Sequence, residues 1–141
     1  MIFLDTSVCI DILRGNTVLA DLLDQYEEEF FGITILSVFE LELGLYRAQL
    51  QKQPLSKQIL TKYEADLNEL LGQLVQFSLE ENSARQSAQI YAKLKRNGLE
   101  SQPFDCLIAG VIFANGFNEI ITGNPAHFRN IENLIVHEYS P

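Results

Sequence analysis

Short apolar runs that alternate with helical patterns are the feature of this sequence that most limits its fold. Five of these runs have the length and composition of buried strands. They are Ile2–Leu4, Gly32–Leu36, Leu74–Phe77, Glu119–Thr122 and Leu134–Glu138. Strands that are apolar on both faces are typical of parallel sheets with helices on both sides. The alternation therefore predicts an α/β fold around a five-stranded parallel sheet.

The segments between the runs have helical periodicity, and glycines such as Gly15 and Gly98 are placed to end helices. The expected helices are Ser7–Leu13, Val18–Glu28, Val38–Gln51, Leu55–Leu71, Ser83–Arg96 and Pro103–Ala114. The connections between parallel strands should be right-handed crossovers. The 141 residues contain no linker, repeat or low-complexity stretch, so we expect a single domain over residues 1–141.

Composition excludes several classes of protein. Hydrophobic residues make up 47% and charged residues 21%, which is not the balance of a disordered chain. No apolar run approaches the roughly 20 residues of a membrane span, and the first residues lack a basic signal-peptide region. Cys9 and Cys106 lie in apolar helical patterns and are expected to be reduced core thiols. We therefore expect a cytoplasmic protein that does not associate with a membrane.

Polar residues follow the predicted strands where an open parallel sheet binds its ligands. Asp5 follows the first strand, Glu40 lies early in the helix after the second, and Asp105 opens an apolar helix. Asn124 follows the fourth strand. If these residues converge, the carboxylates would bind a hard cation such as Mg²⁺ or Mn²⁺. Such an ion lowers the pKa of a water and stabilises the leaving oxygen of a phosphodiester, as in a metal-dependent nuclease.

Each of these residues also has a purely structural interpretation. Asp5 is a favoured cap for the helix that follows it. Ser37 and Glu40 have the spacing of a capping box, in which Glu40 would only satisfy a backbone N–H. Asp105 in a first helical turn is stabilised by the helix dipole. Asn124 precedes a proline, which is a common turn signal.

Motifs of other enzyme classes are absent. The sequence has no P-loop, no G-x-G-x-x-G and no G-x-S-x-G. His127 and His137 lack zinc-ligand spacing and are expected to be structural or exposed. A phosphate-receiver domain would need an aspartate after the third strand, but Ser78-Leu79-Glu80 stands there. These absences favour the nuclease interpretation.

Four blocks in order resemble those of the PIN-domain nucleases, and among them the VapC-type toxins of bacterial toxin–antitoxin pairs. They are residues 2–7, 35–44, 104–109 and 121–128. The first is an apolar strand followed by Asp-Thr-Ser, and the third is an aspartate that opens an apolar helix. In the second, a Glu-Leu pair precedes Gly44 by four residues, which selects Glu40 over Glu42. The fourth has a threonine two residues before Asn124.

Four positions depart from the family's pattern. Asn124 and His127 stand where an acid is frequent, and Gly123 stands where a basic residue is frequent. Phe39 stands where small residues are commoner. None of these departures affects the three carboxylates. They leave open whether one or two metal ions bind.

The resemblance implies a three-layer α/β/α fold and a Mg²⁺- or Mn²⁺-dependent endoribonuclease that forms a homodimer and binds a cognate antitoxin. Asp5, Glu40 and Asp105 would hold the metal, and Asn124 would be a weaker ligand or would position a water. Three hydroxyl residues would orient the carboxylates. They are Thr6, Ser7 and Thr122. A PIN nuclease that acts in RNA processing or DNA cleavage, or an inactive interaction module, remain alternatives.

A net charge of −9 argues against a broad basic surface for RNA. The candidate contacts to a tRNA or rRNA substrate are Arg14, Arg47, Lys93, Lys95 and Arg96. The last three could instead complement a helix dipole. Because the overall field is unfavourable, we expect slow and selective cleavage. An antitoxin would dock on the apolar stripe of Val18–Glu28 or Leu55–Leu71, unless these stripes serve the core or a dimer.

Overall fold

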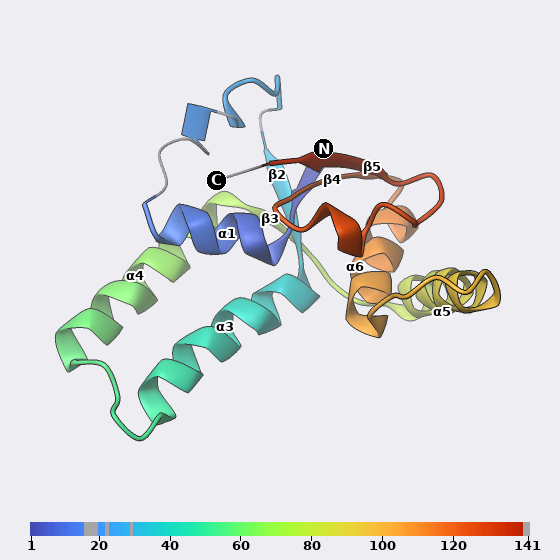
Figure 1. The fold of residues 1–141 in the computed structure, drawn as a ribbon. Helices are drawn as coiled ribbons and strands as arrows, with labels where there is room; N and C mark the ends of the chain where they lie inside the picture. Colours follow the sequence, from blue (N-terminus) through green and yellow to red (C-terminus); the bar gives the residue numbers. More distant parts are fainter. Residues whose placement is uncertain (16–19, 22, 29, 140–141) are drawn as a thin grey trace.

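The computed structural model describes residues 1–15, 20–21, 23–28 and 30–139, and its centre is a parallel five-stranded sheet (Figure 1). The order of the strands is β3-β2-β1-β4-β5. The strands are β1 (Ile2–Leu4), β2 (Phe31–Thr34), β3 (Val75–Phe77), β4 (Glu119–Thr122) and β5 (Ile135–Glu138). The helices are α1 (Thr6–Leu13), α3 (Ile35–Leu50), α4 (Lys57–Gln73), α5 (Glu81–Arg96) and α6 (Pro103–Ala114), with a 3₁₀ helix, η1, at Pro125–His127. The predicted α/β fold with five parallel strands is confirmed.

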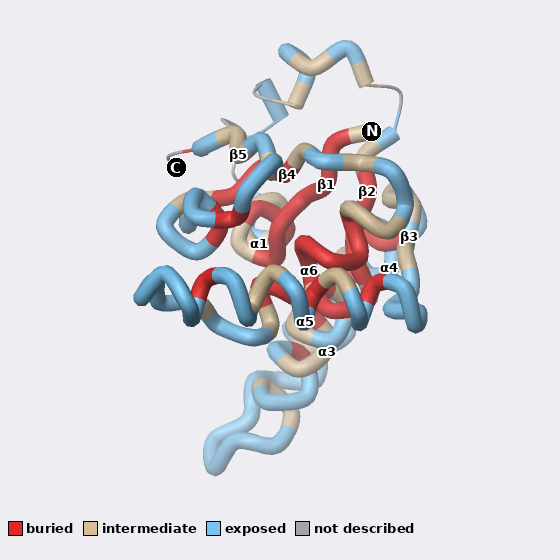
Figure 2. The backbone as a smooth tube through the Cα atoms, turned by 90° about the vertical axis from the view of Figure 1, so that its right-hand side faces the viewer, coloured by how far each residue is buried: buried red, intermediate tan, exposed pale blue. Residues whose placement is uncertain are grey.

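Two apolar clusters lie on opposite faces of the sheet, which gives the three-layer arrangement. In β1, Ile2 and Leu4 belong to one cluster and Phe3 to the other, as expected for side chains that alternate along a strand. The first cluster includes buried residues of α1, α3 and α4, and the second includes those of α5 and α6. Figure 2 shows that β1, β2 and α6 are mostly buried, whereas the link between α3 and α4 is exposed.

The strands are parallel, but the side on which new strands are added to the sheet changes between β1 and β4, a point called the chain reversal below. From β1 it proceeds to β2 and β3 on one side, and it returns to add β4 and β5 on the other side. The Asp5 backbone N–H donates to the Ile121 carbonyl at 3.0 Å, which holds the ends of β1 and β4 together. Open α/β sheets bind ligands at such a reversal, beyond the carboxyl ends of the strands. Asp5 stands at that point.

Helices α5 and α6 pack at backbone distance. A Cβ atom on Gly110 of α6 would lie 1.9 Å from Ser87 Oγ and 2.6 Å from the Ser83 carbonyl oxygen of α5. Ser87 Oγ donates to that same carbonyl at 2.7 Å, so the serine side chain is folded against its own helix. Glycine is therefore required at position 110 for this packing.

Both cysteines are free and buried, which confirms the prediction of reduced core thiols. Burial and the nearby Asp5 carboxylate raise the pKa of Cys9 to about 12. A thiol with such a pKa is not a nucleophile at neutral pH.

The boundary between β2 and α3 differs from the prediction. We expected a strand at Gly32–Leu36 and a helix from Val38 entered through Ser37, but β2 ends at Thr34 and α3 begins at Ile35. Thr34 caps the helix, because its hydroxyl accepts from the Ser37 N–H at 3.3 Å. The capping box of Ser37 and Glu40 is thereby excluded.

The other predicted elements lie within a few residues of the observed ones, with one exception. The helix expected at Val18–Glu28 includes residues 18, 19 and 22, which lie outside the described residues. Within the described part of the chain, no helix is long and apolar enough to cross a membrane.

Candidate active site

The Asp5 carboxylate accepts hydrogen bonds from hydroxyl groups on α1 and on β4. Its Oδ2 atom accepts from Ser7 Oγ at 2.9 Å and from Thr122 Oγ1 at 2.8 Å. Asp5 occupies the N-cap position of α1, but its backbone carbonyl rather than its carboxylate accepts from the N–H groups of Val8 and Cys9. With only 6% of its surface exposed, Asp5 is a buried carboxylate in a fixed orientation. The sequence-based alternative of a side-chain cap does not hold.

The loop after β4 is built on the same hydroxyl groups. Ser7 Oγ accepts from the Gly123 N–H at 3.1 Å, and Thr122 Oγ1 accepts from the Asn124 N–H at 2.9 Å. Each hydroxyl therefore donates to Asp5 and accepts from the loop. This places Asn124 beside the carboxylate through its backbone, while its side chain is exposed.

Glu40 enters the site from α3 through Thr6. The Thr6 hydroxyl donates to Glu40 Oε1 at 2.7 Å, although the two residues are 34 positions apart. Burial raises the pKa of Glu40, the Thr6 hydrogen bond partly opposes that rise, and the Asp5 charge adds to it. Because Thr34 caps α3, Glu40 is free for this contact.

Asp105 lies in the first turn of α6, as predicted, and is 9% exposed. Its Oδ2 atom is buried and has no hydrogen-bond partner in the described part of the chain. Burial raises its pKa to about 6, an effect that His127 opposes and that the charges of Asp5 and Glu40 increase. The Asp5 charge thus acts on both Glu40 and Asp105, and the Glu40 charge acts on Asp105, so the three carboxylates lie near one another.

His127 borders the candidate site, a position that was not predicted from the sequence. Its Nδ1 atom lies 3.3 Å from Asp105 Oδ2, an ion-pair distance without the geometry of a hydrogen bond. The imidazole is 51% exposed, so it borders the site on the solvent side. The expectation of an exposed residue was correct, but its position beside Asp105 was not foreseen. The available signal was that His127 stands where the family frequently has an acid.

The carboxylates of Asp5, Glu40 and Asp105 suit a divalent cation, although they do not surround one completely. In residues 1–15, 20–21, 23–28 and 30–139, no three His, Cys, Asp or Glu side chains are close enough to ligate one ion together. However, Asp105 Oδ2 is buried with only the His127 contact at 3.3 Å beside it. Burial raises the pKa values of Glu40 and Asp105, and the Asp5 charge raises both further. Both features are unfavourable without a cation, and Mg²⁺ commonly combines one or two carboxylates with several waters.

The candidate RNA-contacting residues lie outside this carboxylate cluster. Lys93 Nζ lies 3.7 Å from Glu132, and Lys95 Nζ lies 5.3 Å from the centre of the Tyr91 ring. Arg96 shares the last turn of α5 with these lysines, and Arg14 and Arg47 are exposed near the ends of α1 and α3. Among the described residues, none of these five forms an ion pair with the three carboxylates.

The parallel sheet and the carboxylates at its chain reversal make this chain an α/β protein with a candidate cation site. The family model described as the PIN domain matches residues 2–134. The chain therefore belongs to the PIN domain family, which confirms the family that its motifs indicated. A search of curated proteins gives no match.

Solved structures share the fold over nearly the whole chain. VapBC2 from Rickettsia felis, bound to a DNA fragment from its promoter, has a TM-score of 0.81 at 21% identity and covers 99% of both chains. VapBC-1 from nontypeable Haemophilus influenzae has a TM-score of 0.76 at 20% identity and covers 98% of both chains. DNA-bound VapBC from Salmonella typhimurium has a TM-score of 0.74 at 22% identity and covers 98% of both chains. At these identities the similarity establishes the fold.

Proposed function

We propose that this chain is a metal-dependent endoribonuclease and the toxin of a toxin–antitoxin pair in the cytoplasm. Two observations carry the proposal. The Asp5 charge acts on both Glu40 and Asp105 at the chain reversal, and the buried Asp105 Oδ2 has His127 Nδ1 at 3.3 Å in place of a well-formed hydrogen bond. Membership of the PIN domain family supports this interpretation of the cluster.

The proposed roles combine carboxylates as metal ligands with hydroxyl groups that orient them. Asp5, Glu40 and Asp105 hold Mg²⁺ or Mn²⁺, directly or through water. When bound, the cation lowers the pKa of a water and stabilises the charge on the leaving oxygen of the phosphodiester. Ser7 and Thr122 orient Asp5, and the Thr6 hydroxyl orients Glu40. Asn124, on the loop that these hydroxyls hold, positions a water or acts as a weaker ligand.

RNA binding then has to overcome a net charge of −9. A bound cation offsets part of the local negative charge, and the exposed basic residues supply the remaining phosphate contacts. These are Arg14, Arg47, Lys93, Lys95 and Arg96. The combination is consistent with slow, selective cleavage of a tRNA or rRNA.

The antitoxin partner is supported by the relatives and by exposed apolar side chains. The VapBC-5 structure from Mycobacterium tuberculosis is described as a member of the VapBC family of toxin–antitoxin systems. In this chain, four large apolar side chains between residues 46 and 59, on and between α3 and α4, are at least 41% exposed. They are Tyr46, Leu50, Leu55 and Ile59. We propose that a homodimer partner and an antitoxin segment cover this surface.

The decisive test is cleavage of a panel of tRNA and rRNA by the antitoxin-free protein in Mg²⁺, in Mn²⁺ and in EDTA. Asp5→Asn serves as the inactive variant, because it keeps the size of the side chain but removes its charge. We expect discrete fragments that disappear in EDTA and with Asp5→Asn. Cleavage that survives the substitution would show that the site is wrong.

The same experiment separates the alternatives. Absence of cleavage in every condition, together with absence of Mn²⁺ binding by calorimetry, would identify an inactive interaction module. Metal-dependent cleavage of a DNA panel in preference to RNA would identify a nuclease of another role. A small antitoxin gene beside the gene for this chain would support the toxin.

A further inference from the structure

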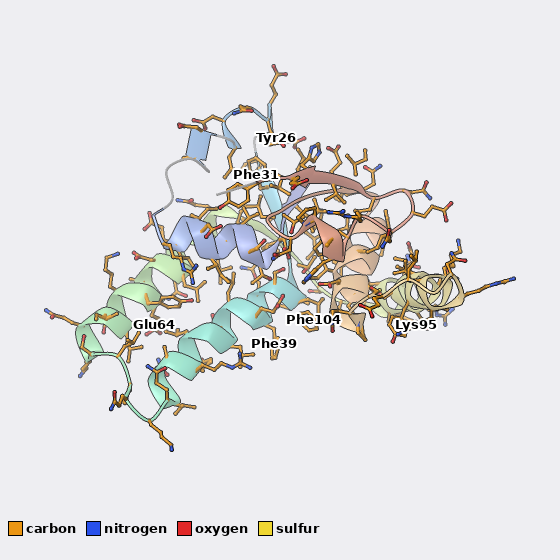
Figure 3. The ribbon with its side chains drawn as sticks, viewed as in Figure 1. Tyr26, Phe31, Phe39, Glu64, Lys95 and Phe104 are labelled. Atoms are coloured by element: carbon orange, nitrogen blue, oxygen red, sulfur yellow. The ribbon has the colours of Figure 1, made fainter. Side chains whose placement is uncertain are left out.

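Two phenylalanines form an aromatic pair at the junction of α3 and α6. The centroids of the Phe39 and Phe104 rings are 5.9 Å apart, and the ring planes are inclined by 50°. Figure 3 shows the two side chains next to each other between the helices. Phe104 is half-buried and packs against the apolar cluster that includes α6, whereas Phe39 is 57% exposed. A ring anchored in the core thus supports a ring at the surface.

The pair lies next to the carboxylates in the chain. Phe39 immediately precedes Glu40, and Phe104 immediately precedes Asp105. Successive Cα atoms are about 3.8 Å apart, so the backbone of each phenylalanine lies one residue from a proposed metal ligand. Successive side chains on a helix point in different directions, about 100° apart. The Phe39 ring and the Glu40 carboxylate therefore leave α3 in different directions from adjacent positions.

Exposure alone does not single out this pair. Tyr46 on the same helix is 54% exposed, and exposed aromatic side chains occur on many protein surfaces. Phe39 differs because a second ring holds its orientation and because it adjoins a proposed catalytic carboxylate. A ring with a fixed orientation loses little conformational entropy when a flat ligand stacks on it.

Charge indicates which ligand the pair fits. The chain has a net charge of −9, and three carboxylates lie beside the pair, so phosphate contacts alone are a weak source of affinity for RNA. Stacking of a base on an aromatic side chain needs no positive charge and contributes about 1–3 kcal/mol per base. We propose that Phe39, supported by Phe104, is the stacking platform for the base beside the scissile phosphate; this inference rests on the proposed nuclease function.

The test measures binding separately from cleavage. Short single-stranded RNAs that carry one 2-aminopurine are titrated with the full-length protein in EDTA, and fluorescence quenching reports stacking. We expect Phe39→Ala to weaken binding roughly 5- to 100-fold and to remove the quenching. Phe39→Trp should retain both, because its ring also stacks. Phe30→Ala is the matched control, because Phe30 is 52% exposed, precedes β2 and lies outside both the proposed site and the proposed partner surface. It should bind like the parent protein.

Phe104→Ala tests the supporting role. It should reduce the quenching while Phe39 is still present, and thermal melting establishes that the variant is folded. Equal binding by Phe39→Ala and the parent, or equal losses for Phe39→Ala and Phe30→Ala, would overturn the platform. If Phe39→Ala loses antitoxin binding but binds RNA like the parent, the stacking platform is also overturned, and the pair is a protein-docking surface instead.

Failure of the platform and failure of the proposed function give different results. Metal-dependent RNA cleavage with binding that does not depend on Phe39 would overturn the platform alone. Phe39-dependent binding and quenching, without cleavage in either metal, would support the platform as a base-binding site and overturn the nuclease function.

Discussion

Thr122 Oγ1 donates to Asp5 Oδ2 at 2.8 Å and so joins two residues that are 117 positions apart. Thr122 ends β4 and Asp5 follows β1, which are adjacent strands on the two sides of the chain reversal. The same hydroxyl accepts from the Asn124 N–H. One buried side chain therefore orients a proposed metal ligand and holds the loop that carries Asn124.

Thr122→Val tests this relationship, because valine has nearly the shape of threonine but can neither donate nor accept. We expect metal affinity or activity to fall roughly 10- to 100-fold, as is typical when a group that orients a ligand is removed. Calorimetry with Mn²⁺ and cleavage assays measure the effect. Thr122→Ser keeps the hydroxyl and should recover most of the affinity. A valine variant with the Mn²⁺ affinity of the parent would show that the hydrogen bond does not orient the ligand.

The raised pKa of Asp105 predicts the pH dependence of stability without metal. Between the ordinary pKa of 3.8 and the value in the fold of about 6, the native protein binds more protons than the unfolded chain. The free energy of unfolding should therefore fall as the pH rises through this interval. The contribution is at most about 3 kcal/mol.

Asp105→Asn is the matched variant for that titration. In EDTA, we expect its stability advantage over the parent to grow between pH 4.5 and pH 7, as measured by thermal melting. With Mn²⁺ at pH 7 the order should reverse, because a bound ion stabilises the parent by about 4 kcal/mol at a thousandfold excess over Kd. A constant difference between the two proteins across this pH range would contradict the raised pKa.

Two kinds of constraint in the sequence predict the three carboxylates at one edge of the sheet, and their role as metal ligands stays a prediction. Parallel strands end at one edge of the sheet, so Asp5 and Glu40 were expected at that edge before the order of the strands was known. Asp105 was expected there as the only charge in its apolar helix. In each case a single strong constraint placed the residue.

The start of α3 and the place of His127 were not predicted, for physical reasons. Thr34 and Ser37 are both suitable helix caps, and the choice depends on pairing with β3, where Thr34 aligns with Phe77. His127 reaches Asp105 only through the fold of the loop after β4. Both outcomes depend on contacts between distant segments, which local patterns do not contain.

Gly110→Ala tests the close packing of α5 on α6. The added methyl group would overlap Ser87 and the Ser83 carbonyl, so we expect a loss of roughly 1–3 kcal/mol of stability. Gly72→Ala is the control: a Cβ there meets nothing within 4 Å, and alanine in a helix is favoured over glycine by up to about 1 kcal/mol. Denaturant unfolding measures both. A Gly110→Ala variant as stable as the parent would mean that α5 and α6 move apart at little cost in free energy.

The salt dependence of RNA binding separates charge from stacking. Each phosphate contact contributes about 0.7 to the slope of log affinity against log salt for single strands. If Lys93, Lys95 and Arg96 contact RNA, their joint replacement by glutamine should lower that slope by about 2. Phe39→Ala should weaken binding and leave the slope unchanged, because stacking releases no counterions. An unchanged slope in the triple variant, with a lower melting temperature, would instead assign these residues to stabilising the end of α5.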